Sequence, residues 1–148
     1  MNNKMKMVFS ALAENEAFAR AASAAFVMAL DPTVEELTEI KTAVSEAVSN
    51  SVIHGYAGWE DRTQALVELE CEINERGRVI IVVTDHGCGI ADVKEAMQPL
   101  FSTVESEERC GMGFTVMESF MDKLQVKSEE GKGTAVTMTK YLDLVSGL

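Results

Sequence analysis

Basic side chains are scarce in this chain of 148 residues. It has 13 Lys and Arg against 24 Asp and Glu, which gives a formal net charge of −11 at pH 7. A surface with this charge repels phosphate backbones and anionic membranes at long range, so direct binding to nucleic acid or membranes is not expected. A basic protein partner would be attracted instead.

Cysteines and long apolar runs are also scarce. The chain has three cysteines, Cys71, Cys88 and Cys110, and no CxxC motif. An odd number without this motif argues against a disulfide framework or a zinc site, and it predicts a reduced, cytoplasmic chain. The apolar run at residues 21–30 predicts a buried helix, because a membrane span takes about 20 residues. The first ten residues hold no long apolar run, so no signal peptide is expected.

Two long helices are predicted in the first part of the chain. The first spans about residues 14–30 and ends before Pro32, because proline disfavours helical geometry in the residue that precedes it. Thr33 and Glu36 form the T-x-x-E pattern of a capping box. This pattern predicts the start of a second helix, which the apolar spacing continues to His54.

The second helix carries a column of polar side chains beside its apolar face. In SEAVSNSVIHGY, residues 45–56, Glu46 and Asn50 stand four residues apart, and His54 follows after four more. Residues with this spacing lie one above another on a helix. The column is either a solvated helix edge or the wall of a site that uses a carboxylate and a carboxamide. Gly55 is expected to cap the helix C-terminus.

Strand patterns and turn residues fill most of the remaining chain. Short helices are predicted near residues 92–97 and 112–120, whereas 98–110 have no clean period. Strands are predicted at about residues 4–11, 64–74, 78–85, 124–128 and 134–140. This order predicts one domain, residues 1–148, with an α/β (α+β) two-layer sandwich in which helices cover one face of a mixed, mostly antiparallel sheet.

Three stretches that contain glycine suggest ligand contacts. TDHGCGI, residues 84–90, places Asp85 at a strand end before GxG, where the carboxylate can accept a hydrogen bond, although a plain turn explains the pattern equally well. RCGMGFTVMESF, residues 109–120, opens a helix with GxG as phosphate cradles do, but fits neither the Walker nor the dinucleotide pattern. EGKGTAV, residues 130–136, is a hairpin turn or places Thr134 against a ligand.

The order of these motifs is more specific than any one of them. The chain has E-x-x-x-N on a helix, then D-x-G-x-G after a strand, then G-x-G opening a helix, and last G-T on a strand. This order resembles the ATP-binding family shared by gyrase, heat-shock 90 chaperones, sensor histidine kinases and mismatch-repair ATPases. The resemblance implies a Bergerat-type ATP-binding fold. It implies an N-box at residues 46–54, glycine loops at 85–89 and 109–113, and an ATP lid at about 98–110.

Two longer runs narrow the resemblance. DPTVEELTEIKTAVSEAVSNSVIHGY and QPLFSTVESEERCGMGFTVMESFMD are similar to the sporulation anti-sigma F factors, and the similarity extends over about residues 7–141. Members of that family are serine kinases that also hold a sigma factor inactive. The resemblance implies ATP and Mg²⁺ as cofactors and a homodimer. It also implies two protein partners, a sigma factor and an anti-anti-sigma protein that is phosphorylated on serine.

The resemblance assigns roles to residues around the nucleotide. Asn50 would give its carboxamide oxygen to Mg²⁺, and Glu46 would orient or deprotonate the attacking serine hydroxyl. Asp85 would accept a hydrogen bond from the adenine amino group. Further contacts to the base or the phosphates are implied for Gly87, Gly89, Gly111, Gly113 and Thr134.

Three further residues have two interpretations each. Arg109 would reach the terminal phosphate, or it is a solvated charge. Arg20, on the first helix, would contact the protein partners, or it is an ordinary surface residue. His54 would touch phosphate or interact with the helix C-terminus.

Two departures from the family pattern leave the catalytic rate open. Ser102-Thr103-Val104 stands where the family has Thr-Thr-Lys, and His86 and Cys88 stand where smaller residues are usual. A binding module that sequesters sigma without phosphoryl transfer is therefore an alternative, and so is a stress-type anti-sigma kinase.

Overall fold

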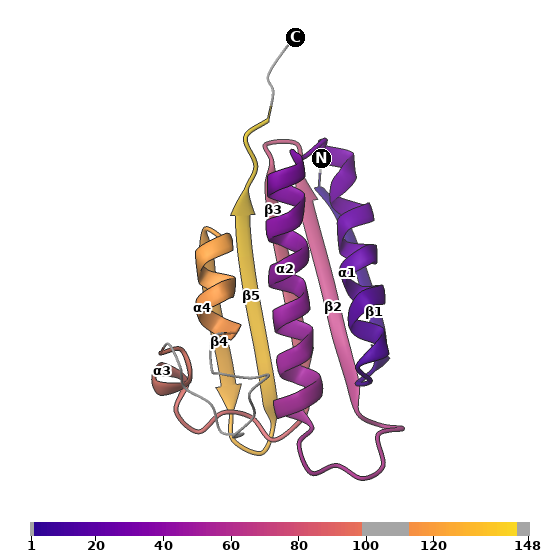
Figure 1. The fold of residues 1–148 in the computed structure, drawn as a ribbon, viewed down its shortest axis with the longest axis vertical. Coiled ribbons are helices and arrows are strands. Elements are labelled where there is room, and N and C mark those ends of the chain that lie inside the picture. Colours follow the sequence, from indigo (N-terminus) through magenta and orange to yellow (C-terminus); the bar gives the residue numbers. More distant parts are fainter. Residues whose placement is uncertain (1, 99–112, 145–148) are drawn as a thin grey trace.

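A sheet forms one layer and helices form the other in the computed structural model, which describes residues 2–98 and 113–144 (Figure 1). The strands are β1 (Asn2–Ser10), β2 (Leu66–Asn74), β3 (Arg78–Asp85), β4 (Lys123–Glu129) and β5 (Gly133–Tyr141). Their order in space is β1-β2-β3-β5-β4, and all four pairings are antiparallel. The predicted two-layer sandwich is confirmed. The described strands pair only antiparallel, whereas a mixed, mostly antiparallel sheet was expected.

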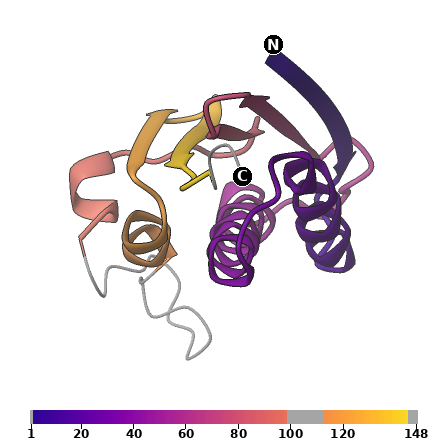
Figure 2. The ribbon, with the colours of Figure 1, turned by 90° about the horizontal axis from the view of Figure 1, so that it is seen from above.

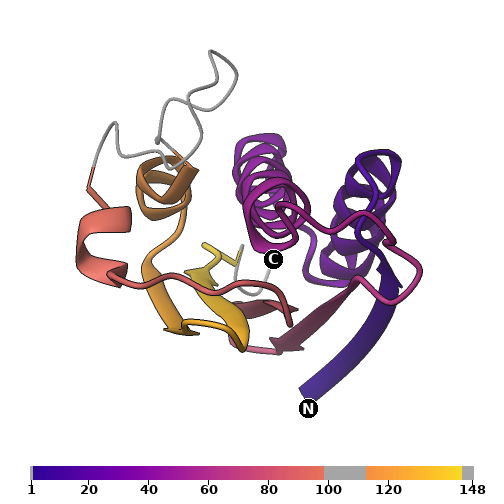
Figure 3. The same cartoon turned by 90° about the horizontal axis from the view of Figure 1, so that it is seen from below.

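The helices gather on one face of the sheet. Figures 2 and 3 show α1 (Glu14–Val27), α2 (Val34–Asn50) and α4 (Gly113–Phe120) side by side over that face. The short helix α3 (Val93–Ala96) lies beside β4. Because α2 stands between α1 and α4, it contacts both neighbours and the sheet. None of the described helices has the length and apolar character needed to cross a membrane.

Local signals in the sequence explain where the first two helices end and begin. After α1 the chain tightens into a 3₁₀ turn, η1 (Met28–Leu30), and Asp31 takes a left-handed conformation with φ of 52° just before Pro32. The capping box of α2 is confirmed: the Thr33 hydroxyl accepts from the Glu36 amide at 3.0 Å, and the Glu36 carboxylate accepts from the Thr33 amide at 2.9 Å.

The core lies between α2 and the central strands. Alternate residues of β2 and β3 point to the helices, while Ile40, Ala43, Val44, Ala47 and Val48 of α2 point back at them. The period of two that buries Val79, Ile81 and Val83 also puts Asp85 on the buried side, two residues past Val83, where the apolar run ends. The sheet itself therefore delivers a carboxylate to the edge of the core. Burial also raises the pKa of the Cys71 thiol, in β2, to about 12, so this cysteine stays protonated.

Candidate nucleotide site

Asp85 lies at the end of β3, and its carboxylate accepts hydrogen bonds from neighbouring residues. The residue is 4% exposed. The Ser51 hydroxyl donates to Oδ2 at 3.0 Å, and the Gly87 amide donates to Oδ1 at 3.0 Å. Burial raises the pKa of the Asp85 carboxyl, and the hydrogen bonds from Gly87, Ser51 and the Thr134 amide oppose that rise. An ionised carboxylate has about four acceptor sites, and these three donors leave one of them for a ligand N–H.

The end of the long helix differs from the prediction. Residues Ser51–Gly55 form a π turn, labelled η2, and Tyr56 is the residue that caps it. The predicted capping role of Gly55 is therefore wrong, and Gly55 does not adopt a left-handed conformation. Its lack of a side chain serves packing, because a Cβ there would lie 2.9 Å from Cγ of Asp85. π turns of this kind are often found at functional sites.

The first glycine loop packs closely on the π turn. A Cβ on Gly87 would lie 1.7 Å from the carbonyl oxygen of Gly55, so no other residue fits there without moving the backbone. The Cys88 amide donates to that same carbonyl at 2.7 Å. Gly89 has φ of 73°, and a Cβ on it would meet the backbone of Glu129 at 2.2 Å. The two glycines predicted from D-x-G-x-G thus meet strict steric demands, and a plain exposed turn does not explain them.

Tyr56 joins the π turn to the end of β3. Its ring is buried, and its hydroxyl accepts from the His86 amide at 2.8 Å while donating to the Leu66 carbonyl. Burial raises the pKa of Tyr56, so the hydroxyl keeps the proton that it donates.

Thr134 lies opposite Asp85 in the β3–β5 pairing. Its hydroxyl and that of Ser128 are 2.8 Å apart, and Ser128 also donates to the Gly133 carbonyl at 2.9 Å. Because a serine hydroxyl has one hydrogen, Thr134 is the donor between the two. Thr134 therefore supports Asp85 through its backbone amide while its hydroxyl belongs to a small β4–β5 network.

The predicted column on α2 meets the N-terminus of α4. A Cβ on Gly113 would lie 3.1 Å from Nδ2 of Asn50 and 3.4 Å from Oε2 of Glu46. Both side chains are half-buried between the two helices, and so they do not form a fully solvated edge. His54 falls inside the π turn, where spacing by four no longer places it directly above Asn50.

Lys140 holds the other end of α4. This lysine is buried in β5, and its ammonium donates to the carbonyl of Phe120, the last residue of α4, at 2.8 Å. It also lies 3.6 Å from a carboxylate oxygen of Glu39 on α2. Lys140 thus joins the C-terminal end of α4 to β5 and to α2.

The remaining predicted residues lie apart from Asp85 and the α2 column, or outside the described residues. Arg20 donates to Glu16 at 3.3 Å and to the Ser45 hydroxyl at 3.2 Å, so it bridges α1 and α2 while its side chain stays 39% exposed. Arg109, Gly111 and residues 102–104 lie outside the described residues. Among the described residues, no cluster of three or more His, Cys, Asp or Glu could hold a metal ion.

Comparison with known proteins gives one consistent family. The model of the histidine kinase-like ATPase domain matches residues 9–140. The chain is 56% identical over 140 residues to the anti-sigma F factor of Clostridium novyi (strain NT), covering 95% of each protein. It is 52% identical over 142 residues to the anti-sigma F factor of Bacillus cereus (strain G9842), covering 96% of this chain and 94% of the relative.

Solved structures share the fold at low identity. The RsbU and RsbW domains of Rv1364c from Mycobacterium tuberculosis superpose with a TM-score of 0.69 at 19% identity, covering 96% of this chain and 32% of that one. The mycobacterial sensor histidine kinase MprB gives a TM-score of 0.56 at 14% identity, with 98% and 100% covered.

Proposed function

Because the chain belongs to the anti-sigma F factors, within the family of histidine kinase-like ATPase domains, we propose that it is an ATP-dependent protein serine kinase that also sequesters a sporulation sigma factor. Its kinase substrate is a serine of an anti-anti-sigma protein, and the active form is a homodimer. Membership of the family supports ATP binding. The phosphorylation of serine, the partner proteins and the homodimer are what we propose in addition.

The observation that carries the proposal is the buried carboxylate of Asp85 beneath two close-packed glycines. An oxygen acceptor at 4% exposure, held by Ser51 and Gly87, suits a ligand N–H and disfavours a ligand carbonyl in the same place. Adenine presents an amino group, whereas guanine would present a carbonyl oxygen there. The close backbone packing at Gly87 and Gly89 fixes the loop beside Asp85, and we assign contacts with the base to this loop.

The phosphates would lie along α2 toward α4. Asn50 and Glu46 offer hard oxygen atoms beside Gly113, and such donors suit Mg²⁺, which keeps water and phosphate oxygens as its other ligands. In this arrangement Asn50 would hold the ion, which neutralises phosphate charge when bound. The N-terminus of α4 is favourable for an anion, and we assign phosphate contacts there to Gly113 and Gly111. Arg109 is assigned to the terminal phosphate.

Glu46 is the proposed base. One helical turn separates it from Asn50, so the group that accepts the serine proton and the group that holds the metal face the same phosphate. The serine oxygen attacks the γ-phosphorus of ATP, its proton passes to Glu46, and ADP leaves. The partner that brings the serine would dock near Arg20 on α1.

The test is phosphoryl transfer from labelled ATP with Mg²⁺ to the anti-anti-sigma protein. We expect label on one of its serines, and we expect Glu46→Gln to lower the rate about 10²–10⁴-fold while ATP and sigma still bind. An absence of label with the wild-type chain, together with intact sigma binding, would favour the binding module without kinase activity. Wild-type transfer by Glu46→Gln would show that Glu46 is not the base.

A further inference from the structure

Arg62, in the loop between the π turn and β2, reaches back to three backbone carbonyls. One terminal nitrogen donates to Ala11 at 3.0 Å and to Val52 at 2.9 Å, and the other donates to Tyr56 at 3.2 Å. Val52 lies in the π turn, and Tyr56 caps it. The side chain therefore holds the end of α2 against the junction of β1 and α1.

The chemistry of this contact suits arginine. The last carbonyls of a helix lack partners within the helix, and a positive charge at this end is favourable. A guanidinium carries five N–H groups in a rigid plane, so one side chain can serve several carbonyls at once. A lysine ammonium keeps the charge but not this planar geometry.

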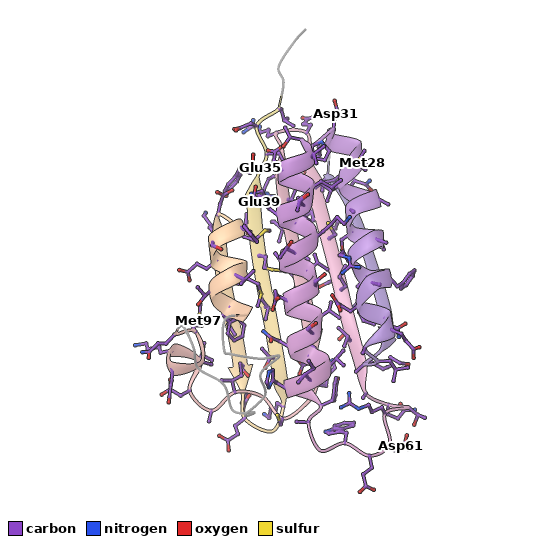
Figure 4. The ribbon with its side chains drawn as sticks, viewed as in Figure 1. Met28, Asp31, Glu35, Glu39, Asp61 and Met97 are labelled. Carbon is purple, nitrogen blue, oxygen red and sulfur yellow. The ribbon has the colours of Figure 1, made fainter. Side chains whose placement is uncertain are left out.

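The π turn and Tyr56 are hydrogen-bonded to Asp85 and to the glycine loop that follows it. Ser51, at its start, donates to the Asp85 carboxylate, and Gly55, at its end, accepts from the Cys88 amide at 2.7 Å. The Tyr56 hydroxyl accepts from the His86 amide. The Cys88 thiol also donates to the His54 carbonyl at 3.2 Å, so four hydrogen bonds run between the segment held by Arg62 and residues 85–88. In Figure 4 the neighbouring Asp61 lies at this end of the molecule, opposite Asp31.

We propose that Arg62 is a positioning residue for purine recognition: by fixing the π turn, it sets the place of Ser51, Gly55 and Tyr56, and through them the place of Asp85 and the glycine loop. This inference rests on the proposed binding of adenine at Asp85. The hydrogen bonds that Arg62 makes reach Ala11, Val52 and Tyr56 and not Glu46, Asn50 or Gly113, so we expect its loss to affect the base more than the phosphate contacts.

The experiment compares Arg62→Met and Arg62→Lys with the wild type and with Arg76→Met. Arg76 is exposed in the β2–β3 turn, at the end of β3 opposite Asp85, so its loss controls for removing a positive charge. Calorimetry with ATP·Mg²⁺ and with adenosine is done at a temperature where circular dichroism shows every variant folded. GTP·Mg²⁺ is titrated in parallel.

We expect Arg62→Met to weaken ATP and adenosine binding by about the same factor, on the order of tenfold, and to narrow the preference for ATP over GTP. Arg62→Lys should fall between Arg62→Met and the wild type, and Arg76→Met should match the wild type. Amide hydrogen exchange of His86 and Cys88 should be faster in Arg62→Met. These amides donate to Tyr56 and Gly55, and the substitution is expected to loosen both acceptors.

The outcomes separate this inference from the proposed function. If the wild type binds no ATP, the proposed function fails. If the wild type binds ATP and folded Arg62→Met has unchanged affinities for ATP and adenosine and an unchanged preference over GTP, Arg62 only supports the fold and the inference is wrong. If Arg62→Met does not fold, Arg62→Lys decides by the same affinities.

Discussion

At the scale of single residues, Asp85 is an acidic side chain that the fold buries, although burial of its charged form does not stabilise the protein without a ligand. Its burial raises its pKa, and three hydrogen bonds only oppose that effect. Such a carboxylate is costly unless a ligand uses it. Two predictions test the two sides of this balance, ligand binding and stability.

The first prediction concerns ligand binding. Asp85→Asn can turn an N–H donor toward the adenine amino group in place of an acceptor. A lost hydrogen bond to a charged group is worth about 1.5–3 kcal/mol, so ATP affinity should fall by about tenfold or more. Calorimetry with ATP measures this loss. Asp61→Asn, the same change in an exposed turn at the same end of the molecule, should leave the affinity unchanged. An unaltered affinity for Asp85→Asn would remove Asp85 from the base site.

The second prediction concerns stability and pH without nucleotide. Because burial raises the pKa of Asp85 above its ordinary 3.8, the folded state binds more protons than the unfolded state in the window above 3.8. The stability contributed by this group therefore falls as pH rises through the folded pKa. Asparagine does not titrate, so the difference in unfolding free energy, Asp85→Asn minus wild type, should grow with pH over that window and then level off.

Urea unfolding over a pH series measures this difference. Other carboxyls, such as Glu36 and Glu68, have lowered pKa values, and their opposite pH dependence is common to both proteins. A difference that stays flat, or that shrinks as pH rises, would contradict a raised pKa for Asp85.

At the scale of helices and strands, the sequence predicted most of the fold because the signals are local. The capping box of Thr33 and Glu36, the Asp31-Pro32 stop and the alternation in β2 and β3 each act within a few residues. The alternation even carried Asp85 to the buried side. The meeting of Asn50 and Glu46 with Gly113 depended on the order of motifs, since nothing local joins α2 to α4.

The parts that sequence reasoning missed depend on backbone contacts between distant segments. A π turn has the same apolar pattern as an α-helix, so Gly55 looked like a cap when it is a close-packing position. Ser51 donates to Asp85, a contact between distant segments for which the sequence carries no local signal. Arg62 bonds to carbonyls, which every residue possesses, so no pattern of side chains could have indicated its partners.

A prediction at this scale separates the two ends of α2. Thr33→Ala removes the capping box at its N-terminus, and the free energy of unfolding should fall by about 1 kcal/mol, within a range of roughly 0.5–2. The nucleotide residues lie at the other end of the helix, so ATP affinity in the folded protein should not change. Urea unfolding and calorimetry measure the two quantities. Thr38→Ala, at an exposed threonine of the same helix, is the matched control.

At the scale of the whole molecule, α2 lies between the proposed partner contact on α1 and the proposed phosphate contacts at α4. Ser45 receives Arg20 from α1, while Glu46, the next residue, faces Gly113 at the start of α4. Consecutive residues on one helix thus face its two neighbours. A partner bound at Arg20 would stand one helix away from the proposed base, which is a suitable arrangement for a protein that both holds a partner and transfers a phosphoryl group to another.

The last prediction tests this division. Arg20→Glu breaks the bridge to Ser45 and Glu16 and reverses the charge of the proposed docking site on an already acidic protein. If Arg20 is a hot spot, sigma and anti-anti-sigma binding should each weaken by about 30-fold or more, the equivalent of roughly 2 kcal/mol. ATP affinity should stay at the wild-type value, because Arg20 contacts none of the nucleotide residues.

The control for Arg20→Glu is Arg76→Glu, which changes the net charge from −11 to −13 in the same way but in the exposed β2–β3 turn. If the general field of the acidic surface governs association, both variants should weaken partner binding equally, and added salt should remove the difference from the wild type. If the contact is local, Arg20→Glu alone should lose affinity, with the loss mainly in the dissociation rate. Equal affinities for wild type and Arg20→Glu would place the partner surface elsewhere on the molecule.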